Sequence, residues 1–303
     1  MAQFNKIKLS ISVLLSSVVL GSGLCYADTQ LTASTPEAMQ KIATGKKSMV
    51  VTNNPWSSKA ANQILNDGGN ATDAAIAAAL VLSLTEPQSS GIGGGGYTLS
   101  YYKGKLKAYD GRETAPRAAT PTLFLDANGK PMQFRDAWLD PKSAGIPGEI
   151  AMLYQLHQDS GKLAWKKLMQ PAIKLARNGF PMSYILNKEL NEEIDVFKND
   201  PAVRNVYFDA NGNVKPVGAM VKNPAFAKTL EQIAADPRSF YEGKIAKNIV
   251  AAMNKSAGSE YYTLKDMKEY EDFFKTDEFK KMTFWQRVKI RIYFAIFGTI
   301  SQF

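Results

Sequence analysis

The sequence of 303 residues carries a formal net charge of +9 and contains one cysteine and one histidine. These counts exclude an intramolecular disulfide and the usual zinc-site spacings, so we expect no metal and no other cofactor. Much of the positive charge lies in the C-terminal tail, so it does not indicate a nucleic-acid partner.

The N-terminus has the composition of a secretory signal peptide over residues 1–27. Lys6 and Lys8 precede an apolar run at 9–20, and Cys25-Tyr26-Ala27 supplies a cleavage site. The apolar run is too short to span a bilayer. We expect cleavage after Ala27, export to a bacterial periplasm or the medium, and no membrane span.

Two helices are predicted after a loosely ordered N-terminus at 28–46 that is rich in Thr, Ser and Gln. Residues 57–67 form the first helix, which a pair of glycines ends. Asn70, with Asp73 three residues later, begins the second helix by reciprocal capping, and its alanines allow close packing.

A glycine run at 91–96 is followed by a predicted hairpin over Tyr97–Tyr109, with its turn at Lys103-Gly104. Glycine backbone can approach another chain or a ligand closely. Arg112 comes directly after the hairpin, behind Asp110-Gly111. A guanidinium fixed there is suited to a two-point grip on a carboxylate, which indicates a small anionic substrate.

Each of these features has a plainer interpretation. A phosphate-binding loop needs Gly-Lys-Ser/Thr between a strand and a helix, whereas Tyr97 follows the glycines here, so nucleotide binding is not expected. The glycine run is then either a tight packing turn or a wall of the site. Arg112 on its own is equally a surface salt-bridge residue.

The remaining body is predicted to be mainly helical from 147 to 271. The expected helices start at Pro147-Gly148, at 163–179 with an interruption at Pro171, at 183–199 as one exposed acidic helix, at 224–236, and at a last short segment capped by Thr263 and Asp266.

Two Asp-Ala-Asn-Gly segments, at 126–129 and 209–212, superficially suggest calcium loops. Both lack the distal glutamate that closes such a loop, so hairpin turns are expected. His157 lies on a helical face without a partner histidine or a Gly-x-Ser-x-Gly elbow, and we interpret it as a surface or capping residue.

Short motifs follow one another in a fixed order between residues 47 and 272. They are Asn70-Ala71-Thr72-Asp73-Ala74-Ala75, Glu86-Pro87-Gln88, Gly91-Ile92-Gly93-Gly94-Gly95-Gly96, Asp110-Gly111-Arg112-Glu113-Thr114-Ala115-Pro116, Gly145-Ile146-Pro147-Gly148 and Gln170-Pro171-Ala172-Ile173-Lys174-Leu175-Ala176. Their order resembles the large subunit of γ-glutamyltransferases (glutathione hydrolases), and we assign residues 47–272 to that region.

The resemblance implies an α+β fold, the αββα sandwich of N-terminal nucleophile hydrolases, incomplete because only the large-subunit part is present. It also implies that Arg112 binds the α-carboxylate of a γ-glutamyl substrate such as glutathione, with Glu113 as a structural partner. Gly111 departs from the family in a minor way, since many members carry a larger side chain there.

Family precursors cleave themselves to expose a threonine at the start of the small subunit, which attacks the γ-glutamyl amide and passes the group to water or an amino acid. This sequence has no Thr-Thr pair, and its histidine lies in Leu156-His157-Gln158. We therefore assign no catalytic residue and expect a truncated chain, without the small subunit and inactive alone. The alternative is a non-enzymatic exported remnant that binds γ-glutamyl groups or amino acids.

The tail at 273–303 does not resemble the family. It combines a basic stretch with an apolar and aromatic run at 290–300 that is too short to span a membrane. We interpret it as the product of a frameshift or gene interruption. An amphipathic segment that packs on the body or on a membrane surface is the alternative.

Overall fold

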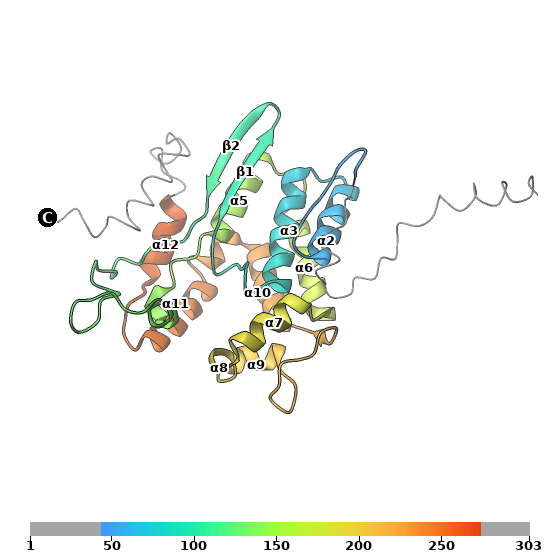
Figure 1. The fold of residues 1–303 in the computed structure, drawn as a ribbon. Coiled ribbons are helices and arrows are strands. Elements are labelled where there is room, and N and C mark those ends of the chain that lie inside the picture. The colour runs from blue at the N-terminus through green and yellow to red at the C-terminus, as the bar shows by residue number, and fades with distance from the viewer. Residues whose placement is uncertain (1–43, 274–303) are drawn as a thin grey trace, which may run out of the picture. The chain divides into compact units, whose positions relative to one another are not determined.

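The structure, a computed structural model, describes residues 44–273. The signal peptide predicted at 1–27, nearly all of the segment 28–46 and the tail beyond residue 273 lie outside the described residues. Within the described range helices predominate, together with two short antiparallel sheets, so the described part mixes helix and sheet as predicted (Figure 1).

The elements follow one another along the chain with short connections. The helices are α2 (Pro55–Asn66), α3 (Ala71–Thr85), α4 (Phe134–Leu139), α5 (Glu149–Ser160), α6 (Trp165–Asn178), α7 (Tyr184–Glu192), α8 (Ile194–Phe197), α9 (Pro201–Tyr207), α10 (Pro224–Ala235), α11 (Lys244–Ala257) and α12 (Leu264–Phe273), with 3-10 turns η2 (Pro141–Ser143) and η3 (Pro237–Phe240). The strands are β1 (Tyr97–Tyr102), β2 (Lys105–Asp110), β3 (Phe180–Pro181) and β4 (Met220–Val221).

Helix α3 is the centre of the helical core. Its predicted capping box is present, because the Asn70 side chain accepts from the Asp73 N–H while the Asp73 carboxylate accepts from the Asn70 N–H. Ile76, Leu80 and Leu84 are buried, and the alanines between them let α2 and α6 pack closely on the helix. The alanine-rich sequence therefore forms a helix that is covered on several sides.

Strands β1 and β2 form the predicted hairpin, in a register that pairs Tyr97 with Asp110. Lys103 and Gly104 have φ values of 50° and 76°, the positive angles that a type I′ turn requires. One face of the hairpin contacts α5, where the Thr98 hydroxyl lies 3.5 Å from the sulfur of Met152 (Figure 1). The other face is apolar and open.

Two helix predictions were wrong. Helix α6 continues through Pro171, where an interruption was expected, because its buried face packs on α3 and α10 and outweighs one missing backbone hydrogen bond. The segment predicted as one exposed helix at 183–199 is divided into α7 and α8 at Glu193, and Leu186 and Leu190 of α7 are buried.

No helix in residues 44–273 has the length and apolar character that crossing a bilayer demands.

Candidate functional site

The glycine run lies between the end of α3 and the start of β1, and backbone hydrogen bonds hold it on two sides. The Gly111 N–H donates to the Gly96 carbonyl at 2.8 Å. The Gly148 and Glu149 N–H groups both donate to the Gly94 carbonyl, at 2.9 and 3.0 Å. The run is therefore fixed between the end of the hairpin and the start of α5.

Close backbone contact explains why glycine is needed at several of these positions. A Cβ atom on Gly95 would lie 1.9 Å from the Gly111 carbonyl oxygen, and one on Gly148 would lie 2.1 Å from the same atom. A Cβ on Gly111 would lie 2.5 Å from the Cβ of Met152. Three segments thus meet with no room for side chains at their crossing, and Met152 takes the space beside Gly111.

The loop that enters the glycine run is anchored by a buried carboxylate. Glu86 is 4% exposed, and it accepts hydrogen bonds of 2.6 Å from the side-chain amides of Asn54 and Gln88. Both carboxylate oxygens are thereby satisfied, which makes burial of this charge tolerable. The contact ties the end of α3 to the start of α2.

Arg112 sits directly after β2 with its backbone held at both polar groups. Its N–H donates to the Asp110 carboxylate at 3.0 Å, and its carbonyl accepts from the Tyr270 hydroxyl at 2.6 Å. The side chain is 56% exposed and forms an ion pair of 3.0 Å with Glu113, the partner expected from the sequence. A fixed backbone with an exposed guanidinium suits recognition of a carboxylate.

A second carboxyl group, that of Glu149, lies beside the glycine run at the start of α5. Its nearer oxygen is 3.8 Å from where a Cβ on Gly96 would lie. Burial, and then the negative charge of Glu113, raises the pKa of Glu149 to about 7. The site therefore combines a cation with two carboxyl groups, one of which titrates near neutral pH.

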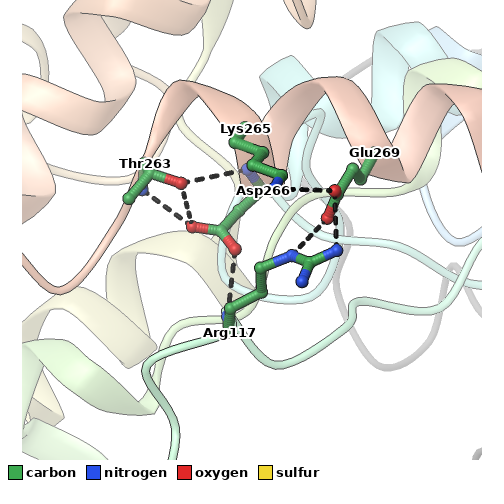
Figure 2. A network of polar contacts seen from close by, with 5 residues as sticks. All are labelled: Arg117, Thr263, Lys265, Asp266 and Glu269. Atoms are coloured by element: carbon green, nitrogen blue, oxygen red, sulfur yellow. Dashed lines mark hydrogen bonds and ion pairs between the residues drawn. The ribbon is translucent and has the colours of Figure 1, made fainter.

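Helix α12 borders the same region and binds the segment that follows Arg112. The Arg117 N–H donates to Asp266 at 3.0 Å, and its guanidinium binds Glu269 with Nη2 at 2.6 Å (Figure 2). Asp266 also caps α12 by accepting from the hydroxyl of Thr263 (Figure 2). A pocket of about 180 Å³ lies between the segment and the helix.

The other residues considered in the sequence have structural contacts. The Nε2 atom of His157 lies 2.8 Å from the Leu163 carbonyl, and the ring packs against Trp165. Asp126 and Asp209 each accept from backbone N–H groups within tight turns, as predicted for hairpin loops. Among residues 44–273, no three His, Cys, Asp or Glu side chains are grouped to hold a metal.

The sequence placed Arg112, Glu113 and the glycine run in one region, and the structure brings them together. It did not indicate Tyr270, which lies 158 positions from Arg112 in the chain. Glu149 follows the Gly-Ile-Pro-Gly motif directly, so its place next to that motif was the available signal for it.

Comparison with known proteins gives consistent matches. A family model described as gamma-glutamyltranspeptidase matches residues 57–283. The chain is 40% identical over 223 residues to glutathione hydrolase 2 of Arabidopsis thaliana, which covers 73% of this chain and 37% of the relative. It is 34% identical over 265 residues to the glutathione hydrolase proenzyme of Bacillus subtilis strain 168, covering 86% and 44%. The chain thus spans less than half the length of these relatives.

Solved structures agree with these matches. The gamma-glutamyltranspeptidase of Helicobacter pylori has a TM-score of 0.71 and 31% identity, covering 76% of this chain and 66% of that chain. The gamma-glutamyltranspeptidase of Pseudomonas nitroreducens, complexed with L-DON, has a TM-score of 0.68 and 36% identity, covering 75% and 66%.

Proposed function

Because this chain belongs to the gamma-glutamyltranspeptidase family and shares its N-terminal nucleophile hydrolase fold, we propose that Arg112 grips the α-carboxylate of γ-glutamyl compounds such as glutathione. One observation carries the proposal: the Arg112 guanidinium is 56% exposed while its backbone is fixed on both sides. A fixed cation loses little freedom when it binds an anion. Glutathione hydrolysis is the function that the names of the relatives support.

The reaction proposed for the complete enzyme is acyl transfer. A threonine hydroxyl attacks the γ-glutamyl carbonyl, the amide C–N bond breaks, and the amine leaves with a proton, so a γ-glutamyl ester remains on the enzyme. Water or the amino group of an acceptor then breaks the ester and regenerates the hydroxyl. This chain contributes the carboxylate grip, and we propose that the nucleophile comes from a small subunit whose Thr-Thr-His context this sequence does not contain.

The open face of the hairpin supports a partner of this kind. Leu99, Tyr101 and Leu106 are 67%, 76% and 70% exposed, although the alternate positions that face α5 include the polar Thr98 and Lys107. An apolar sheet face of this kind is normally covered by a second layer. A small subunit that adds strands here would complete the sandwich.

Residues 1–27 are proposed to direct export and to be removed after Ala27, which places the protein in the periplasm or the medium. N-terminal sequencing of the mature protein tests this, and a first residue other than Asp28 contradicts it. Cys25 leaves with the signal in this account.

Release of a chromophore from a γ-glutamyl anilide tests the catalytic proposal. The purified chain is expected to show no turnover above blank. Adding the segment of a relative that carries its small subunit is expected to produce turnover that Arg112→Ala abolishes. Arg135→Ala serves as the matched control, because Arg135 is 55% exposed and is also paired with a glutamate, Glu193. Turnover by the purified chain alone would contradict the absence of a nucleophile.

The second candidate, a non-enzymatic binder of γ-glutamyl groups or amino acids, rests on the same exposed guanidinium. It predicts binding of glutamate by the chain alone that disappears in Arg112→Ala, with no turnover after any small-subunit segment is supplied.

A further inference from the structure

We propose that Tyr270 is a positioning residue for Arg112, so that helix α12 sets the geometry of the carboxylate grip; this rests on the proposed function. The Tyr270 side chain is 3% exposed, and its hydroxyl donates to the Arg112 carbonyl at 2.6 Å. A short hydrogen bond from a buried donor fixes that carbonyl more firmly than solvent would.

The space around the Tyr270 hydroxyl fits this role. A Cβ atom on Gly148 would lie 1.9 Å from the hydroxyl oxygen, so the absence of a side chain at Gly148 lets the tyrosine reach Arg112. The Tyr270 ring stacks on Tyr241, with centroids 6.0 Å apart and ring planes within 7° of parallel. The Tyr241 hydroxyl donates to the Pro147 carbonyl at 3.1 Å. The stacked pair therefore holds both loops that meet at the glycine crossing.

The same helix holds the far end of the Arg112 segment. Arg117 is bound through its backbone to Asp266 and through its guanidinium to Glu269 (Figure 2), so α12 contacts the segment at Arg112 and again at Arg117. Between these contacts lies the pocket of about 180 Å³, lined in part by Thr114 and Ala115. Since this space is not filled by core side chains, the end contacts do most to hold the segment in place.

The experiment compares Tyr270→Phe with Tyr262→Phe in the full chain. Both phenols are buried and donate to backbone carbonyls, but the Tyr262 hydroxyl binds Pro141 and Ala144, at 2.7 Å each, rather than Arg112. Tyr270→Phe keeps the ring and removes only the hydrogen bond. Amide hydrogen exchange in a peptide spanning residues 110–116 is the first readout, and titration with L-glutamate is the second.

Tyr270→Phe is expected to speed exchange at Arg112 and to weaken glutamate binding about three- to tenfold, the effect of one neutral hydrogen bond. Tyr262→Phe is expected to change neither. Unchanged exchange in Tyr270→Phe, or the same change in both variants, overturns the positioning role. Faster exchange with unchanged glutamate affinity also overturns it, since the hydrogen bond would then be structural only.

Arg117→Ala provides a second variant that spares the core, because the Arg117 side chain is 65% exposed. It is expected to speed exchange in the same peptide, and a lack of change overturns the claim that α12 holds the segment. If the native chain does not bind glutamate, the proposed function fails, and the exchange measurements alone then decide whether Tyr270 positions Arg112.

Discussion

At the residue scale, Arg112 differs from an ordinary surface arginine in its backbone rather than in its side chain. Its ion pair with Glu113 is exposed and contributes little to stability. Its N–H and carbonyl, however, are bound by Asp110 and Tyr270. Holding the backbone while leaving the guanidinium accessible favours ligand binding over stability.

Glu149 gives a prediction about pH. Its folded-state pKa of about 7 lies above the ordinary value of 4.5, so the proton stabilises the folded chain. This stabilisation is complete below pH 4.5 and is lost as the pH rises through 7. Relative to Glu149→Gln, the native chain should lose up to about 3 kcal/mol between pH 5 and 8, and less to the extent that solvent reaches the group.

Urea unfolding of both proteins at pH 5 and pH 8 measures this difference. Glu192→Gln is the control, since Glu192 is 55% exposed on α7 and pairs only with Lys188. Parallel pH dependence in the native chain and Glu149→Gln would show that Glu149 ionises normally.

At the scale of elements, the glycine run predicts a sharp contrast between two neighbours. Gly95→Ala places a methyl group on the Gly111 carbonyl oxygen, whereas a Cβ on Gly93 meets nothing within 4 Å. Gly95→Ala should therefore cost at least about 2 kcal/mol and lower the Tm by roughly 4–8 °C. Gly93→Ala should stay within about 0.5 kcal/mol of the native chain. Equal melting temperatures for the two variants would mean that the crossing is not close-packed.

The elements also show what could be predicted from sequence. The α3 capping box, the Lys103-Gly104 hairpin turn and the Asp-Ala-Asn-Gly turns depend on residues close in the chain, and all were predicted. The continuity of α6 through Pro171 was not, because it depends on packing against α3 and α10.

The candidate site divides in the same way. Arg112, Glu113 and the glycine run are neighbours in sequence and were placed together. The contact of Tyr270 with Arg112 joins residues 158 positions apart, and no local pattern marks it. The raised pKa of Glu149 depends on burial and on the charge of Glu113, which also arise only in the folded chain.

At the scale of the whole molecule, the open hairpin face predicts poor behaviour of the chain on its own. Leu99, Tyr101 and Leu106 present an apolar surface, and the two-stranded sheet has unpaired edges within the described residues. The purified chain should associate or aggregate at micromolar concentration. Replacing Leu99, Tyr101 and Leu106 together with threonine should increase the monomer fraction in sedimentation velocity. A monomeric native chain with a cooperative thermal melt would contradict this account.

The central claim is that Arg112 recognises an α-carboxylate, and calorimetric titration with L-glutamate and γ-aminobutyrate tests it most directly. The two ligands share a carboxylate and an amino group, but γ-aminobutyrate lacks the carboxylate on the α-carbon. We expect the chain to bind glutamate at least about tenfold more tightly, since a charge-assisted two-point contact contributes on that order, and we expect Arg112→Ala to remove the preference. Equal binding of the two ligands, or a preference that survives in Arg112→Ala, would contradict the account.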